Sequence, residues 1–84
     1  MFYIYVLENP KRQWYTGYSK NLNLRLKKHH NDAVYSTMRI GGPWRLIYYE
    51  ACLNELDARK REKFLKTGRG KQFIKNRLKY YLKS

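Results

Sequence analysis

The feature that most constrains the fold is an unbroken apolar and aromatic run near the start of the chain, Phe2–Leu7. The run contains the β-branched residues Ile4 and Val6 and no charged residue. A strand with one face in water would alternate apolar and polar residues, so this pattern favours a strand that is covered on both faces. Because the chain has 84 residues, we expect a single domain over residues 1–84 with a core of modest size.

Two further strands are predicted from short aromatic runs. Asn9-Pro10-Lys11 is a turn signal, and Gln13–Tyr18 supplies a second strand that completes a hairpin with the first. A sharp turn at Gly41-Gly42-Pro43 precedes the third strand, Trp44–Ala51.

A first helix is expected between the second and third strands. Ser19 or Asn21 can cap it, and it runs to about His30. A polar connection over Asp32–Met38 follows the helix. The apolar stripe of this segment comprises Leu22, Leu26 and Ala33.

Two helices are expected after the third strand. Asn54 followed by Asp57 is similar to a capping box and opens a helix that runs to about Thr67. Gly68 and Gly70 are expected to end that helix in the left-handed conformation, and the last helix covers Lys71–Leu82. The order is therefore ββαβαα, an α+β fold in which a small three-stranded antiparallel sheet is flanked by helices.

Charge indicates the class of partner. Nineteen Lys and Arg residues against six acids give a net charge of +13, an excess that a polyanion such as nucleic acid would neutralise. No segment combines a wide apolar face with a basic face, which disfavours a membrane surface as the partner. The lone Cys52 cannot form an internal disulfide or a cysteine-based metal cluster, so we expect a reducing, cytoplasmic location. Charge alone does not separate a nuclease from a binding protein.

Four short motifs occur in a fixed order along the chain. Tyr3-Ile4-Tyr5 is followed by Tyr15-Thr16-Gly17, and Arg25 is followed four residues later by His29. The segment Ala58-Arg59-Lys60-Arg61-Glu62 comes after the third strand. In order and spacing these motifs resemble those of the GIY-YIG nuclease superfamily, in particular its small stand-alone bacterial members. Tyr3 stands in place of the glycine of the first triplet, and Thr16 replaces the isoleucine of the second.

The resemblance implies a metal-dependent endonuclease that hydrolyses phosphodiester bonds in DNA. It implies that Tyr5 activates the attacking water and that Glu62 binds the ion, Mg²⁺ or Mn²⁺. The implied catalytic set is Tyr5, Tyr15, Arg25, His29 and Glu62, and Asn76 is the candidate for a late asparagine that the family often carries. A free phenol has a pKa near ~10, so Tyr5 is expected to need nearby cations that favour its phenolate.

Each of these residues also has an ordinary structural interpretation. Tyr5 and Tyr15 can be packing aromatics, and Arg25 and His29 can lie on a solvated basic face, as we expect for Lys27, Lys28 and His30. Glu62 can form a surface ion pair with Lys66, worth about 0.3–0.5 kcal/mol. However, Glu62 lies mid-helix between Ala58 and Leu65 on a stripe that can face the sheet, and a single carboxylate suffices for an ion that keeps most of its waters.

Several residues are expected to contact the DNA backbone around this site. They are Trp14, which we expect to be exposed, and the basic residues Lys60, Arg61, Arg69 and Lys71. The form of the DNA stays open among branched, single-stranded and duplex, and a protein partner can supply the specificity that so short a chain lacks. The alternative function is a nucleic-acid-binding module of the same fold with weak or absent catalysis.

Overall fold

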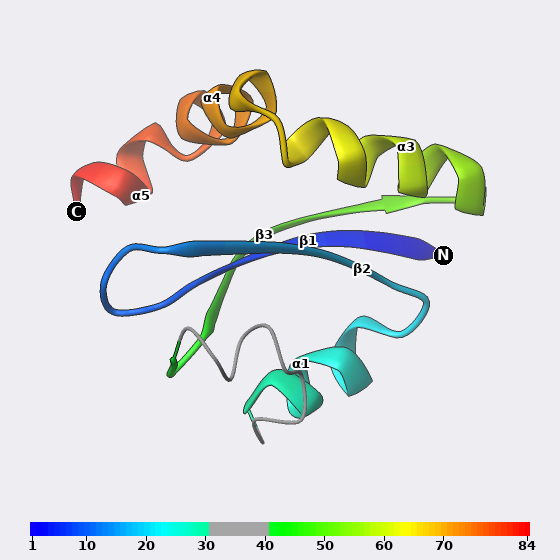
Figure 1. Ribbon diagram of the computed structural model, residues 1–84, viewed down its shortest axis with the longest axis horizontal. Coiled ribbons are helices and arrows are strands. Elements are labelled where there is room, and N and C mark those ends of the chain that lie inside the picture. The colour runs from blue at the N-terminus through cyan, green and yellow to red at the C-terminus, as the bar shows by residue number, and fades with distance from the viewer. Residues whose placement is uncertain (31–40) are drawn as a thin grey trace.

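Strand β1 (Phe2–Glu8) lies at the centre of a three-stranded antiparallel sheet with the order β2-β1-β3. Its neighbours are β2 (Trp14–Ser19) and β3 (Arg45–Cys52). The computed structural model describes residues 1–30 and 41–84. Figure 1 shows helix α1 on one side of the sheet and α3, α4 and α5 on the other. The expected α+β fold and the order of its elements are thereby confirmed, with one additional short helix at the end.

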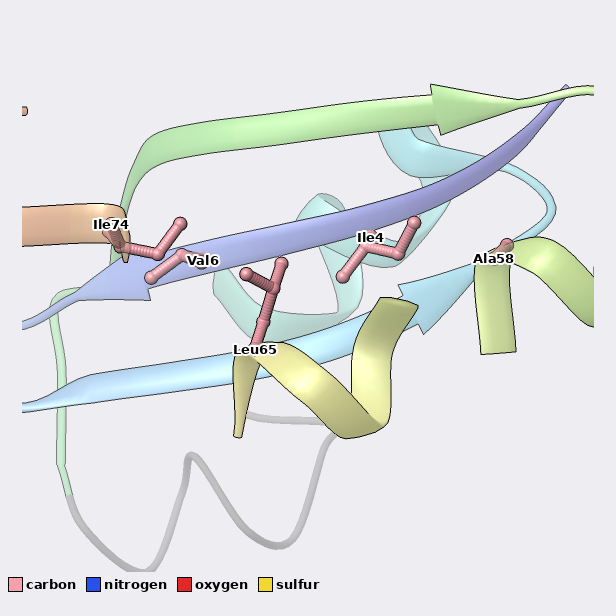
Figure 2. Close-up of a cluster of buried hydrophobic side chains, with 5 residues drawn as sticks. All are labelled: Ile4, Val6, Ala58, Leu65 and Ile74. Atoms are coloured by element: carbon pink, nitrogen blue, oxygen red, sulfur yellow. The ribbon is translucent and has the colours of Figure 1, made fainter. Parts of the chain in front are cut away.

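Successive residues of β1 point to opposite faces of the sheet, as the period of a strand requires. Ile4 and Val6 face the layer of α3 and α4, where they pack with Ala58, Leu65 and Ile74 (Figure 2). All five side chains are at most 1% exposed, and full burial stabilises an aliphatic side chain by about 1.5–3 kcal/mol. The prediction of a strand covered on both faces is correct.

The other face of β1 meets α1 (Leu22–His30). Tyr5 and Leu7 are buried there with Trp44, and Leu22 and Leu26 of α1 pack against them. Asn21 caps the helix, because its side-chain oxygen accepts a hydrogen bond from the backbone N–H of Leu24 at 3.1 Å. The expected connection over residues 32–38, Ala33 included, lies outside the described residues.

Helix α3 (Glu55–Leu65) also begins as predicted, since the side chain of Asn54 accepts a hydrogen bond from the N–H of Leu56 at 2.8 Å. The expected left-handed stop is wrong. Gly68 and Gly70 instead form the first turn of α4 (Gly68–Arg77), whose cap is Thr67. A Cβ at Gly70 would lie 2.0 Å from the carbonyl oxygen of Phe64, so glycine is required there for close packing rather than for its backbone freedom.

The last predicted helix, Lys71–Leu82, is in fact two helices. Helix α4 ends at Arg77, Leu78 leaves the helical conformation with φ −108° and ψ 25°, and α5 covers Lys79–Lys83. The hairpin turn between β1 and β2 is held by Asn9, whose side-chain oxygen accepts hydrogen bonds from the N–H groups of Lys11 and Gln13. Within the described residues, no helix is long and apolar enough to cross a membrane.

Candidate active site

The side chain of Tyr5 lies between two residues of helix α1. Its hydroxyl oxygen accepts a hydrogen bond from Nε of Arg25 at 3.2 Å and lies 2.9 Å from Nε2 of His29. The guanidinium can only donate, so the phenolic proton is left to point at His29, which accepts it when the ring proton is on Nδ1. Arg25 and His29 are one helical turn apart and therefore reach the same strand residue.

Gly17 lies directly opposite Tyr5 in the β1–β2 ladder. A Cβ at this position would lie 2.5 Å from both Cζ and the hydroxyl oxygen of Tyr5. The phenol therefore occupies the space above Gly17, and any other residue would displace it.

Tyr15 completes the aromatic part of the site. Its ring meets the ring of His29 edge-on with centroids 5.0 Å apart, and it lies 6.3 Å from the ring of Tyr5. Arg25 also interacts with Tyr15, so four of the five residues expected at the catalytic centre, Tyr5, Tyr15, Arg25 and His29, are in mutual contact.

Burial sets the protonation of this cluster. Burial raises the pKa of Tyr5 to about 12, although the hydrogen bond from Arg25 opposes the shift. Burial, helped by the charge of Arg25, lowers the pKa of His29 to about 4. At neutral pH Tyr5 is therefore a phenol and His29 a neutral acceptor. Arg25 favours the phenolate, as expected from the sequence, but desolvation of Tyr5 outweighs its effect, and His29 adds no positive charge.

Glu62 lies on α3, in the helix layer on the other side of the sheet from α1 (Figure 1). Its side chain is 16% exposed and pairs with Nζ of Lys66 at 3.1 Å, so the ion pair considered from the sequence does form. The same carboxylate also raises the pKa of Tyr5 through its negative charge, which means that the phenol and the carboxylate interact electrostatically. Glu62 therefore forms a conventional helix ion pair, and its charge also acts on the Tyr5 phenol.

Comparison with known proteins decides the family. The sequence model described as the GIY-YIG catalytic domain matches residues 1–76. The chain belongs to the GIY-YIG family. This confirms the family resemblance read from the four motifs.

The chain is also similar to relatives of comparable size. A UPF0213 protein of Pediococcus acidilactici is 40% identical over 81 residues, which cover 94% of this chain and 79% of the relative. A UPF0213 protein of Clostridium perfringens is 36% identical over 66 residues, covering 79% and 71% of the two chains. The solution NMR structure of a UPF0213 protein from Bacillus halodurans has a TM-score of 0.55 at 32% identity and covers 88% of this chain and 82% of its own. None of these names states a reaction.

Membership in the GIY-YIG family indicates which kind of metal ion the side chains of the site should be able to hold. GIY-YIG nucleases act on DNA and generally use divalent metal ions. In the described part of the chain, no three His, Cys, Asp or Glu residues are grouped so that they could hold a metal. A lone carboxylate does not fit a structural zinc site, but it fits an Mg²⁺-type ion that keeps its waters and takes further oxygens from a substrate phosphate.

Asn76 is not part of this GIY-YIG cluster. It lies exposed on α4, in the helix layer opposite α1, and its side chain accepts a hydrogen bond from Gln72 at 3.0 Å.

The residues expected to bind DNA differ in their surroundings. Lys60, Arg69 and Lys71 are exposed. Arg61 is half-buried, donates to both oxygens of Glu50 at 2.8 and 3.0 Å and lies over the ring of Phe73, so its guanidinium already has partners. The expectation that Trp14 is exposed is wrong: it is half-buried against the α3 and α4 layer, and its Nε1 donates to Glu8 at 2.9 Å.

The role of Gly17 was not identified from the sequence. Its missing Cβ makes room for the ring of Tyr5, which fills that space. The signal that could have identified this was the pairing of the two triplets, since antiparallel register places the residue opposite a large side chain on the same face.

Proposed function

We propose that this GIY-YIG domain is a divalent-metal-dependent endonuclease that hydrolyses phosphodiester bonds in DNA. The observation that carries the proposal is the hydroxyl of Tyr5, which is hydrogen-bonded between a permanent cation, Arg25, and a neutral imidazole, His29. Packing alone does not require a buried tyrosine to contact both a proton acceptor and a charged donor. This combination is suited to proton transfer beside a phosphate.

Tyr5 and His29 form a proton relay in this proposal. As a water molecule attacks phosphorus, its proton passes to the oxygen of Tyr5 while the phenolic proton of Tyr5 passes to Nε2 of His29. The new P–O bond forms as the bond from phosphorus to the leaving oxygen breaks. A free phenolate with a pKa of about 12 would cost on the order of 7 kcal/mol at pH 7, whereas His29 is already in its accepting form. The relay therefore avoids a free phenolate.

Arg25 orients this relay and provides positive charge. Its Nε donates to Tyr5 and fixes the direction of the phenolic proton. The guanidinium has five N–H donors, and those not held by tyrosines can bind the non-bridging oxygens of the phosphate, where negative charge grows in the transition state. Tyr15 packs on His29 and holds the imidazole in place.

Glu62 is the residue that would hold the metal ion. When bound, a divalent ion supplies Lewis-acid stabilisation of the phosphoryl oxygens. Lys66, whose side chain is 55% exposed, can move away from the carboxylate with little loss, because exposed ion pairs of this kind contribute only about 0.3–0.5 kcal/mol.

Cleavage assays with matched variants test the proposal. The purified protein is incubated with labelled branched, single-stranded and duplex DNA, with Mg²⁺ or Mn²⁺ or with chelator. Tyr5→Phe and Glu62→Gln should each lower the cleavage rate at least about 100-fold. Tyr80→Phe, on a tyrosine that is 81% exposed, and Asp57→Asn, on the same helix as Glu62, should keep wild-type rates.

Other outcomes would contradict the proposal. Cleavage that survives both Tyr5→Phe and Glu62→Gln would exclude this catalytic centre. If the wild type cuts no DNA in either metal but binds it in a salt-sensitive manner, the alternative of a nucleic-acid-binding module is correct.

A further inference from the structure

A basic groove lies on the face of the sheet away from Tyr5, between the end of the hairpin and helices α4 and α5. It encloses about 610 Å³ and is lined by Arg12 and Trp14 of the hairpin and by Lys71, Lys75, Lys79 and Lys83. We call it the lysine groove. Of its lining, only Lys71 and Trp14 were expected from the sequence to contact DNA.

The four lysines form a row. They recur every fourth residue, a spacing that keeps Lys71 and Lys75 on one face of α4 and Lys79 and Lys83 on one face of α5, and all four line the same groove. All four are exposed, and none has a carboxylate within 4.0 Å among the described residues. Like charges in such a row repel one another unless an anion neutralises them.

The one acid in the groove is already neutralised. Glu8 is 5% exposed, and its carboxylate accepts hydrogen bonds from Arg12 at 3.1 Å, Trp14 at 2.9 Å and the hydroxyl of Tyr81 at 2.5 Å. A carboxylate can be buried only with such partners. Because Tyr81 belongs to α5, this network fixes the lysine row above the hairpin and holds the indole of Trp14 in the groove wall.

The composition of the wall favours a nucleic acid over other polyanions. The ring of Trp14 and the side chain of Leu82 provide apolar surface between the cations. A single nucleic-acid strand presents the matching alternation, since its phosphates need cations and its bases can stack on aromatic rings. An acidic peptide would use only the charges.

We propose that the lysine groove binds a single-stranded extension of the DNA substrate, away from the bond that is cut. This groove proposal rests on the proposed function in one respect, the identification of DNA as the substrate. Glu8 and Trp14 belong to the strand positions that face α4, whereas Tyr5 faces α1. A strand in the groove therefore lies on the opposite face of the sheet from Tyr5, and DNA that ends near the cleavage site does not occupy the groove.

A binding series tests the groove separately from catalysis. Fluorescence anisotropy is measured in chelator with one short duplex that carries a labelled single-stranded overhang of increasing length. The variant is Lys75→Glu/Lys79→Glu, and the control is Lys20→Glu/Lys63→Glu, which makes the same change in charge outside the groove. Circular dichroism melting verifies that both variants fold.

The wild type should bind more tightly as the overhang lengthens. In the groove variant, this increase in affinity should be at least about tenfold smaller. Its log affinity should depend less steeply on log salt, by about 1.4 for two lost single-strand contacts. The control should keep the gain. The proposal is wrong if the two variants lose it equally, if the groove variant keeps it, or if polyglutamate of equal charge competes as well as single-stranded DNA.

Cleavage of the blunt duplex distinguishes failure of the groove from failure of the nuclease. The groove variant should cut it at the wild-type rate, because the lysines do not contact Tyr5. If the wild type cuts nothing but its overhang-dependent binding depends on Lys75 and Lys79, the nuclease proposal fails and the groove stands.

Discussion

Replacing Gly17 with alanine would put a methyl group where the Tyr5 phenol now lies. The added Cβ would be 2.5 Å from Cζ and from the hydroxyl oxygen of Tyr5, and 3.0 Å from Cε1 of Tyr15. Carbon atoms in contact are about 3.5–4.0 Å apart, so the phenol or the strand must shift by roughly 1 Å. Tyr5 is fully buried and bonded to Arg25 and His29, so any such shift breaks the geometry of the proposed relay.

Two magnitudes follow for Gly17→Ala. A displacement of about 1 Å at a reacting group can reduce the rate about 100-fold. Overpacking of a core costs about 1–3 kcal/mol, which in a domain of this size corresponds to a fall in Tm of about 4–8 °C per kcal/mol. The backbone of Gly17 does not have positive φ, so the effect is steric only.

Single-turnover cleavage and thermal unfolding measure these effects. The cleavage assay is run well below the Tm of the variant, so that loss of folded protein does not mimic loss of activity. Gly68→Ala is the control, since a Cβ there meets nothing within 4 Å, and it should leave both quantities unchanged. Wild-type rate and Tm in Gly17→Ala would refute the assignment of Tyr5 to the space above Gly17.

Three further predictions concern stability. The pKa of His29 is lowered to about 4 by burial, so between about pH 6.5 and 4 the unfolded chain binds more protons and the free energy of unfolding falls as the pH falls. The free energy of unfolding measured with urea should therefore be about 2 kcal/mol lower at pH 5 than at pH 8 because of His29. His29→Gln should remove this difference, and His30→Gln should not. Glu8→Gln should lower the free energy of unfolding by about 2–4 kcal/mol, because hydrogen bonds to a buried charge are worth about 1.5–3 kcal/mol each and the amide cannot accept all of them; an unchanged urea midpoint would show that the network is not structural. Gly70→Ala should cost more than about 3 kcal/mol, since its Cβ would lie 2.4 Å from Cα of Leu65, and a Tm equal to that of Gly68→Ala would contradict the close packing of α3 and α4.

Local signals were sufficient for much of the fold. The uninterrupted run of β1 predicted a strand buried on both faces, and the cap signals at Ser19 or Asn21 and at Asn54 predicted two helix starts, because each depends on residues close in the sequence. The break at Leu78 was missed because the apolar spacing continues across it. The two glycines after α3 were misread because their local pattern does not distinguish a left-handed stop from tight packing against Leu65.

In the site, too, local spacing was predictable from the sequence and long-range packing was not. The spacing of Arg25 and His29 predicted that they share a face, and both contact Tyr5. The protonation of the cluster was not predictable from the sequence, because burial and not charge determines it. The lysine groove depends on a contact between Glu8 and Tyr81, which are 73 positions apart and therefore give no local signal. The expectation of an exposed Trp14 was wrong because Trp14 packs against helices that are distant in the sequence.

The central strand also determines how this protein would lose activity. β1 carries Tyr5 on one face and the core residues Ile4 and Val6 on the other, and it is hydrogen-bonded on both edges. A central strand of this kind exchanges its amide hydrogens only through opening of the whole sheet. On heating, Tyr5 should therefore keep its position until global unfolding, unlike a residue on a lid that detaches first. Substitutions within the seven residues of β1 should therefore change heat resistance and turnover together.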